Sequence, residues 1–328
     1  MINLFYNPSY IKSPKVFLTK SFKYSVFYNL YLDFLYLFNL PIQNSLIKSG
    51  PHKRMNNLVI AFRKDPDFVF NKNQYRNSYI VQFDKFGEEI LNRILKESKN
   101  AQILIGPLYS QEYQLKLVDY IAKYPNIKKV VASQSVFTNT VSEMGIDMDK
   151  NKIVIFPSGV ISNKNLFENL KLKKNTDRCL IYFKKRTLQE LDQIKKFLES
   201  KNIEYKVFKY GEYKNRELKK YALNAKFGIF LTGTESQGFA AQELFSCNLP
   251  LLVWDQKINI YGNLTLTGTS MSYWDNNCGL IVDNIDELTN NFQYFYENIH
   301  QYKPHELVES KLTFEKYKEN LKFEFNNF

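Results

Sequence analysis

The sequence has too few cysteines and histidines for several common kinds of site. Its three cysteines lie far apart and form no C-x-x-C pair, which argues against both a zinc site and a disulfide scaffold. Scattered thiols fit a reducing compartment. The three histidines are not spaced as a metal-binding set either. These six residues are Cys179, Cys247, Cys278, His52, His300 and His305.

Long hydrophobic runs are also missing. Residues 22–42 form the most apolar stretch, but Lys23, Asn29 and Asp33 interrupt it, which argues against a membrane-spanning helix. We prefer a buried aromatic helix there, and we leave peripheral membrane contact open. The first ten residues lack the basic region and the small-residue cleavage site of a secretory signal. The sequence therefore predicts a cytoplasmic, intracellular protein.

The chain has an excess of basic residues, with 45 Lys and Arg against 33 Asp and Glu, and a net charge of +12. A basic surface suits anionic partners, namely nucleic acid, anionic membrane or phosphate-bearing substrates. Basic residues form no long block and acidic residues are interspersed among them, so nucleic acid is not favoured as a partner. A length of 328 residues with 44% hydrophobic residues fits two folded domains.

Strand-like and helix-like segments alternate through the second half of the chain. We predict strands at residues 179–183, 203–208, 227–231, 251–254 and 279–282. We predict helices at residues 188–200, 215–224, 239–247 and 286–298. This order indicates a mostly parallel sheet that is covered on both faces.

The first half alternates less clearly. We predict strands at residues 3–5, 58–62, 101–105, 129–133 and 152–156, and helices at residues 87–97 and 111–124. The chain is then an α/β protein with two doubly wound, Rossmann-like domains facing across a cleft, residues 1–156 and 157–303. Residues 304–328 are predicted to form one long polar helix, which we expect to pack back on the N-terminal domain. In such folds, ligands bind at the carboxyl ends of strands, near a switch in strand order.

Residues 228–255, GIFLTGTESQGFAAQELFSCNLPLLVWD, hold the most informative pattern. A predicted strand leads into a turn that contains Gly233, Glu235 and Gly238, and a helix begins near Phe239. The free amides and the dipole of a helix start suit a phosphate. Glu235 and Glu243 could then bind different hydroxyl groups of one ligand. The alternative is an ordinary strand-to-helix loop with solvated glutamates.

This segment resembles a known family. Residues 235–243 (ESQGFAAQE) look like the E-x7-E motif of retaining, family-4-like glycosyltransferases with the GT-B fold, and residues 244–254 (LFSCNLPLLVW) resemble its continuation. Residues 155–160 (IFPSGV) are similar to the family's hinge between domains, and residues 272–279 (SYWDNNCG) to a late segment. The resemblance covers about residues 152–298 and is specific at residues 235–254.

The resemblance implies a role for each matching residue. Glu235 would bind hydroxyls of the transferred sugar, and Glu243 would bind the ribose hydroxyls of the donor. The amides of Gly238 and Phe239 would hold the diphosphate. The remaining donor-binding candidates, from the same loop, are Thr234, Ser236 and Gln237.

Three basic residues, Lys184, Lys185 and Arg186, follow the first strand of the second domain. Family members place basic residues there, and such groups would stabilise the charge that grows on the leaving diphosphate. We prefer Lys184 and Arg186, and together with Glu235 they are the predicted catalytic residues. The transferred sugar would pass through an oxocarbenium-like state. A solvated loop end is the alternative for this basic triplet.

The first domain departs from the family. Residues 7–15 stand where the family has a Gly-Gly loop, and they contain no glycine. Two D-x-D patterns, at residues 65–67 and 147–149, match the metal motif of the other glycosyltransferase fold, but this pattern is frequent by chance, and we expect no metal. Candidates for lining the cleft from this side are Ser13, Lys15, Gly106, Pro107 and Ser133.

The sequence thus predicts a retaining, metal-independent hexosyltransferase. It would move a sugar from a nucleotide-diphosphate donor to a hydroxyl of a glycan, lipid or protein, without any cofactor besides the donor. A sugar-nucleotide epimerase and a non-catalytic nucleotide- or glycan-binding module remain as alternatives, and the missing glycine loop favours the second. Nucleic-acid binding has only the charge in its favour.

Overall fold

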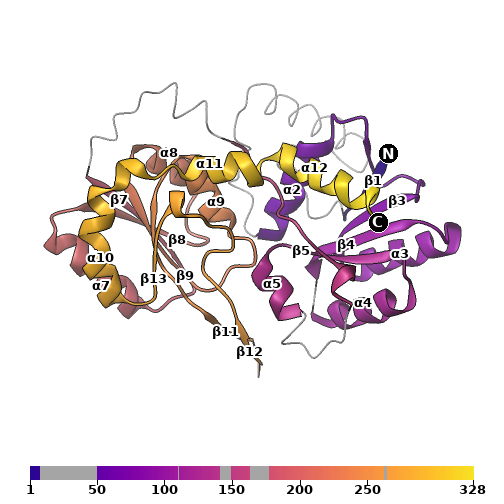
Figure 1. Cartoon of the computed structure of the whole chain (residues 1–328), viewed down its shortest axis with the longest axis horizontal. Helices are drawn as coiled ribbons and strands as arrows, with labels where there is room; N and C mark the ends of the chain where they lie inside the picture. Colours follow the sequence, from indigo (N-terminus) through magenta and orange to yellow (C-terminus); the bar gives the residue numbers. More distant parts are fainter. Residues whose placement is uncertain (8–49, 110, 141–148, 163–176, 262–263) are drawn as a thin grey trace, which may run out of the picture. The chain divides into compact units, whose positions relative to one another are not determined.

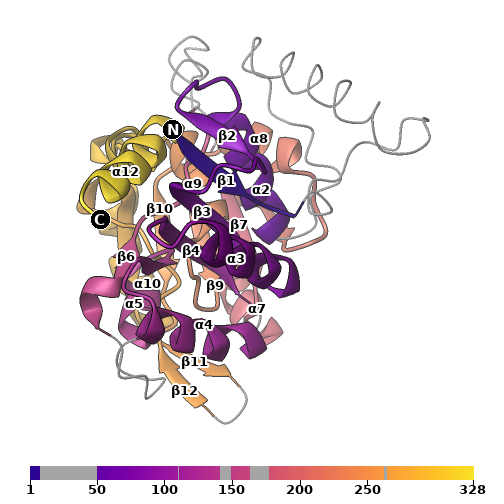
Figure 2. The same cartoon turned by 90° about the vertical axis from the view of Figure 1, so that its right-hand side faces the viewer.

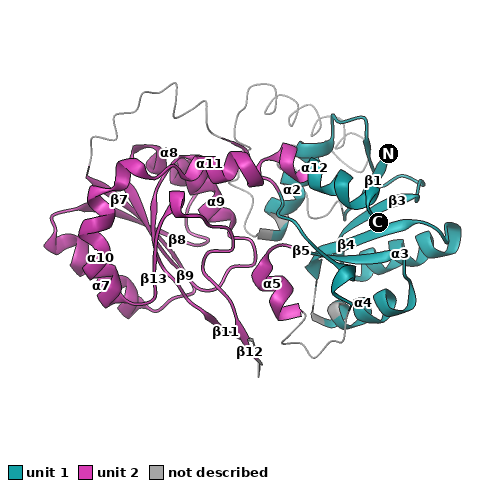
Figure 3. Ribbon diagram, in the orientation of Figure 1, with its two compact units in different colours: residues 1–131, 147–158, 318–328 teal, residues 132–146, 159–317 magenta. Residues whose placement is uncertain are grey.

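A computed structural model of the chain describes residues 1–7, 50–109, 111–140, 149–162, 177–261 and 264–328 (Figure 1). These residues form two compact units (Figure 3). Unit 1 comprises residues 1–131, 147–158 and 318–328, and unit 2 comprises residues 132–146 and 159–317. Of the described residues, none belongs to a helix that is long and apolar enough to cross a membrane.

Unit 1 is built on a six-stranded parallel sheet with the strand order β2-β1-β3-β4-β5-β6. Its helices α3 and α4 lie together on one side of this sheet (Figures 1 and 2). Phe83 of β3 contacts Tyr113 and Tyr120 of α4 edge to face, which holds α4 against the sheet. The strands are β1 (Ile2–Phe5), β2 (Phe68–Phe70), β3 (Asn77–Phe83), β4 (Gln102–Tyr109), β5 (Ile127–Val131) and β6 (Ile153–Ile155), and the helices just named are α3 (Lys85–Glu97) and α4 (Gln111–Lys123).

One predicted strand of this unit is wrong. Residues 58–62 belong to helix α2 (Gly50–Phe62). Met55, Leu58, Val59 and Phe62 are all buried and follow one another at helical spacing, so they form one apolar face of a helix. The run of consecutive apolar residues at the end of this helix looked like a short buried strand. Strands β2 and β3 were not predicted at all.

The predicted strand at residues 101–105 is longer in the structure. Strand β4 continues through Gly106 and Pro107 to Tyr109. Gly106 and Pro107 oppose the single residue Val81, because the register with β3 shifts between Ile80 and Gln82. Such a bulge accommodates a proline, which has no amide hydrogen to donate to a neighbouring strand. The Gly106-Pro107 pair, which suggested the end of a strand, therefore forms an irregularity within the strand.

Unit 2 contains a five-stranded parallel sheet with the order β13-β10-β9-β7-β8. Its elements agree closely with the predicted alternation of strands and helices. The strands are β7 (Arg178–Lys184), β8 (Glu204–Lys209), β9 (Phe227–Thr232), β10 (Leu251–Trp254) and β13 (Gly279–Val282). The main helices are α7 (Leu188–Ser200), α8 (Asn215–Asn224), α9 (Phe239–Ser246) and α10 (Ile285–Glu297).

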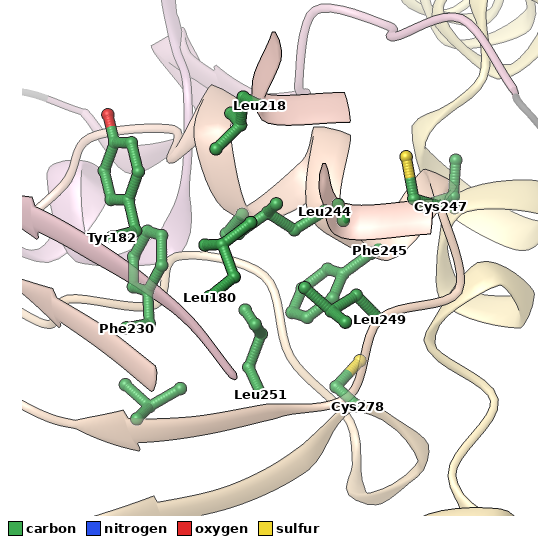
Figure 4. Packing of buried hydrophobic residues seen from close by; sticks show 14 of the residues in the cluster. Leu180, Tyr182, Leu218, Phe230, Leu244, Phe245, Cys247, Leu249, Leu251 and Cys278 are labelled. Carbon is green, nitrogen blue, oxygen red and sulfur yellow. The ribbon is translucent and has the colours of Figure 1, made fainter. Parts of the chain in front are cut away.

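Both faces of this sheet are buried. Side chains of β7 alternate between two hydrophobic clusters, with Leu180 and Tyr182 on one face and Cys179 and Ile181 on the other. The first cluster packs against α8 and α9 (Figure 4), and the second packs against α7 and α10. Burial on both faces explains why β9 and β10 are continuous apolar runs, whereas the edge strand β8 alternates polar and apolar residues.

Two further segments differ from the prediction. A hairpin of β11 (Ile258–Tyr261) and β12 (Leu264–Thr267), which follows β10, was not predicted. The C-terminal segment is not one helix but α11 (Pro304–Leu307), a π-helical turn (Val308–Leu312) and α12 (Phe314–Asn326). The break lies at Thr313, whose extended backbone pairs with Val160. Pairing with another chain segment is a tertiary effect that a helical sequence pattern does not show.

Candidate functional site

The strand order of unit 2 defines where a ligand is expected. Counted along the chain, the five strands lie in the doubly wound order 2-1-3-4-5, so the connections diverge between the first and third strands, β7 and β9. Helix α7 leaves β7 toward one face of the sheet, and α9 leaves β9 toward the other. The carboxyl ends of these strands meet at the pair Lys184 and Thr232. This divergence leaves the edge at Lys184 open to a ligand in folds of this kind.

An ion pair lies at this edge. Lys184 Nζ is 2.5 Å from Glu235 Oε1, and the two side chains are 17% and 13% exposed. The Lys184 ammonium also lies over the ring of Tyr210, 4.6 Å from its centroid. Two predicted site residues that are 51 positions apart in the sequence are thus brought together, one from the end of β7 and one from the loop after β9.

The backbone of Glu235 is fixed on both sides by the segment that follows the hairpin. Its amide donates to the carbonyl of Thr269 at 2.8 Å, and its carbonyl accepts from the hydroxyl of Ser272. Ser270, which is fully buried, donates from Oγ to the carbonyl of Thr232 at 2.8 Å. The loop that carries Glu235 is therefore held in one place without using its carboxylate.

The second predicted carboxylate, Glu243, lies in the second turn of α9 and is 4% exposed. Asn215, the first residue of α8, donates from Nδ2 to Glu243 Oε1 at 2.6 Å. Lys219, one turn further along α8, places Nζ 3.7 Å from the same oxygen. A buried carboxylate needs such partners, because burial of an unpaired charge is costly.

Two tyrosine hydroxyls connect the surroundings of the two carboxylates. Tyr213 donates to the hydroxyl of Tyr182 at 3.3 Å. Burial raises the pKa of both hydroxyls well above the ordinary value, and the negative charges of Glu235 and Glu243 raise both further. Both tyrosines therefore stay protonated.

Gly238 is the N-cap residue just before α9, and it has a left-handed backbone with φ of 70°. A side chain would be strained in this conformation, so the glycine is needed for the turn rather than for space. Gln237 is buried and its side chain donates to Gln242 Oε1 at 3.3 Å, while Ser236 is exposed. Gln237 thus braces the loop from inside, and Ser236 and the partly exposed Thr234 lie nearer to solvent.

Arg186 is used inside the fold. Its side chain is 5% exposed, and its guanidinium donates to Glu190 Oε1 at 2.5 Å. The same group donates to the carbonyls of Thr232 and Trp254 at 3.3 and 2.9 Å. It therefore ties the ends of β9 and β10 to the start of α7. Lys185, between the two predicted catalytic cations, is exposed.

The other candidates belong to other elements of the chain. Ser133 is buried at the start of the five-residue helix α5 (Gln134–Thr138), and its hydroxyl is 3.1 Å from that of Ser135. A β-carbon added at Gly106 would lie 1.8 Å from the Tyr109 hydroxyl, so Gly106 is packed against that ring inside β4, next to Pro107. Ser13 and Lys15 lie outside the described residues.

Several residues around Glu235 and Glu243 were missed by sequence reasoning. Asn215, Lys219 and Tyr213 come from the segment between β8 and α8 or from α8 itself, and Ser270 and Thr269 follow an unpredicted hairpin. The spacing of Asn215 and Lys219, four residues apart in a predicted helix, was a usable signal, because such residues share one helical face. Within the described part of the chain, no group of three or more His, Cys, Asp or Glu residues is arranged to hold a metal ion.

Comparisons with known proteins support the fold. A scan against protein-family models and a search of curated proteins found no match. Among solved structures, the chain is similar to a mutant form of TarM from S. aureus in complex with fondaparinux, α-GlcNAc-glycerol and UDP. That match has 13% identity and a TM-score of 0.51, and it covers 77% of this chain and 56% of TarM.

Two further structures match with TM-scores of 0.46 and 0.42. The pneumococcal O-GlcNAc transferase GtfA in complex with UDP and GlcNAc has 14% identity, with 83% of this chain and 59% of GtfA covered. Sucrose-phosphate synthase from Thermosynechococcus elongatus has 13% identity, with 76% and 73% covered. The chain thus spans little more than half of the TarM and GtfA chains. The predicted α/β class with two Rossmann-like domains, the GT-B architecture, is confirmed.

Proposed function

We propose that the chain is a glycosyltransferase that moves a sugar from a nucleotide-diphosphate donor to a hydroxyl acceptor with retention of configuration. One observation carries the proposal. At the switch point of the unit 2 sheet, Lys184 and Glu235 form a largely buried ion pair beside the start of α9. A cation, a carboxylate and a helix start are the groups that a sugar diphosphate needs.

Each group has a distinct task in this proposal. The amides of Gly238 and Phe239 bind the diphosphate at the start of α9, whose dipole favours negative charge. Glu235 accepts hydrogen bonds from hydroxyls of the transferred sugar. Lys184 stabilises the charge that develops on the leaving diphosphate as the bond from the sugar carbon to the phosphate oxygen breaks.

Glu243 binds the ribose of the donor in the same proposal, as vicinal hydroxyls suit a carboxylate. Arg186 is assigned to the support of Thr232 and Trp254 rather than to the diphosphate, because its guanidinium already has three partners inside the fold. Unit 1 is assigned to the acceptor, a glycan, lipid or protein. No metal takes part in this mechanism, so chelation with EDTA is expected to leave turnover unchanged.

The experiment is a thermal-unfolding screen of the full chain against UDP-, GDP- and other nucleotide sugars. A ligand that binds only the folded state raises its stability, by about 2.7 kcal/mol at a hundredfold excess over Kd. UDP sugars come first because TarM was solved with UDP. The donor that stabilises the chain is then followed by NMR for slow sugar release, and the released sugar is expected to have the donor's anomeric configuration.

Three outcomes distinguish the proposal from its rivals. Release with the inverted anomer would contradict retention, and conversion to an isomeric nucleotide sugar would identify an epimerase. Binding without any turnover, with acceptors of all three classes present, would leave a nucleotide-binding module and overturn the transferase.

A further inference from the structure

Helix α8 holds Glu243 through two side chains. Asn215 Nδ2 donates to Glu243 Oε1 at 2.6 Å, and Lys219 Nζ lies 3.7 Å from the same oxygen. The side chains of Lys219 and Glu243 are 13% and 5% exposed, so both charges are largely withdrawn from water. The two partners are one helical turn apart and approach one carboxylate oxygen, which restricts rotation of the carboxylate.

The two partners contribute different things. Lys219 is a cation, and a nearby cation favours the ionised form of a buried carboxylate. Asn215 is neutral and donates a short hydrogen bond, so it orients the carboxylate without changing the net charge. Binding of two vicinal hydroxyls requires both an ionised acceptor and a fixed orientation. The buried apolar contacts of α8 come from Leu218 and Ala222 rather than from either partner.

We propose that Asn215 and Lys219 are positioning residues that prepare Glu243 to bind the ribose hydroxyls of the donor, so that α8 makes the site selective for ribonucleotides. The inference rests on the proposed function, because it assumes that the nucleotide lies over the start of α9. It extends that function to a second helix and to residues that the E-x7-E resemblance does not include.

The experiment compares UDP with 2′-deoxy-UDP by isothermal titration calorimetry on the full chain. Wild type is expected to bind UDP about tenfold more tightly or better, because one lost hydrogen bond to a charged group corresponds to at least this factor. Lys219→Met and Asn215→Leu are each expected to reduce that preference to about threefold or less. Lys219→Arg keeps the positive charge, and this variant is expected to retain most of the preference for UDP.

Lys220→Met is the matched control, since Lys220 is the next residue of α8 and is exposed. It should leave the preference unchanged. Circular dichroism and thermal unfolding of each variant check the fold, and Asn215→Leu, which removes no charge, provides the result if Lys219→Met does not fold. A GDP and 2′-deoxy-GDP pair replaces the uridine pair if the donor screen selects guanosine.

The outcomes separate this inference from the proposed function. If wild type prefers the ribonucleotide and folded Lys219→Met and Asn215→Leu keep the full preference, α8 has no positioning role and the inference is overturned. If wild type binds neither nucleotide of either pair, the proposed function itself fails and the inference fails with it.

Discussion

The two sheets share the same strand order at their switch points, but they bury lysine in different ways. In unit 2, Lys184 and Lys219 lie 2.5 and 3.7 Å from glutamate oxygens. In unit 1, Lys129 of β5 is 1% exposed, and among the described residues its Nζ has no hydrogen-bond partner. It lies 4.9 Å from the centroid of the Tyr109 ring. Burial lowers the pKa of Lys129 to about 8.

The two arrangements have different consequences for stability. A buried lysine without a carboxylate destabilises its charged form, so Lys129 contributes an unfavourable free energy at neutral pH. In unit 2, Lys184 and Lys219 each have a carboxylate partner, and Lys184 lies at the carboxyl end of β7. Charges that are paired at the expected ligand-binding edge are the better candidates for chemistry.

Removal of the Glu235 carboxylate gives the largest expected effect. Glu235→Gln is expected to lower donor turnover by about a hundredfold to a thousandfold, the range seen when a group that stabilises a transition state is removed. Turnover is measured by nucleotide release with the donor selected in the thermal screen. Asp192→Asn is the control, because Asp192 forms an exposed pair with Lys195 on α7. If folded Glu235→Gln turns over the donor as fast as wild type, the active site does not lie at this edge of the sheet.

Arg186 and Lys184 can be compared within unit 2, because Arg186 is assigned to the stability of the fold and Lys184 to the diphosphate. Arg186→Met is expected to destabilise the chain by about 3 kcal/mol, since it leaves Glu190 and two carbonyls without this partner. Urea unfolding measures the loss. Lys184→Met is expected to lower the stability much less than Arg186→Met does, and to lower donor turnover more. A stable Arg186→Met variant that no longer binds the donor diphosphate would restore the catalytic role predicted from the sequence.

Lys129 tests the other side of the comparison. Lys129→Met is expected to stabilise the chain by about 2 kcal/mol at pH 7, because a pKa near 8 instead of 10.5 penalises the charged amine in the fold. Above pH 8 the unfolded chain holds the proton and the folded chain loses it, so wild-type stability rises with pH and the gain from the mutation shrinks toward pH 10.5.

Urea unfolding of Lys129→Met at pH 7 and pH 9.5, about one unit below the ordinary lysine pKa, measures this trend. The control is Lys128→Met, one residue earlier on β5, where Nζ lies over the ring of Phe328. A Lys129→Met variant that is destabilised at pH 7 and shows no pH trend would mean that the amine is favourably paired, and the contrast between the units would not hold.

The smallest expected effect concerns the loop that carries Glu235. Ser270→Ala removes a buried hydroxyl that donates to the Thr232 carbonyl and accepts from the Gln256 amide. The expected loss is about 1–2 kcal/mol of stability, with a modest decrease in turnover. Ser200→Ala, at the exposed end of α7, is the control. Equal unfolding midpoints for the two variants would show that Ser270 does not brace this loop.

Much of unit 2 could be predicted from its sequence, because its local signals agree with its fold. Residues 179–183 are continuously apolar, and β7 is buried on both faces. Gly238 marks a turn that needs a positive φ, and α9 begins at the next residue. The approach of Lys184 to Glu235 could be expected only in general, since Lys184 ends β7 and Glu235 lies in the loop after the neighbouring strand β9. The contact itself depends on how the hairpin segment fixes the backbone of Glu235.

Unit 1 was less predictable for physical reasons. The apolar run at the end of α2 fits a strand and a helix equally well, because all of residues 58–62 are buried, and only the structure shows that they are helical. The Gly106-Pro107 pair usually ends a strand but here forms a bulge within β4. In unit 2, the helical spacing of Asn215 and Lys219 places both on one face of α8, but the sequence does not show that this face meets Glu243, because Asn215 and Glu243 are 28 residues apart.

The central claim is that Lys184 and the start of α9 bind a nucleotide diphosphate. Isothermal titration of the full chain with UDP and UMP, or with the corresponding pair for the donor base found, tests it directly. Wild type should bind the diphosphate at least about tenfold more tightly than the monophosphate, and Lys184→Met should reduce this ratio to about threefold. An unchanged ratio in folded Lys184→Met, or equal affinity for both nucleotides in wild type, would contradict the account.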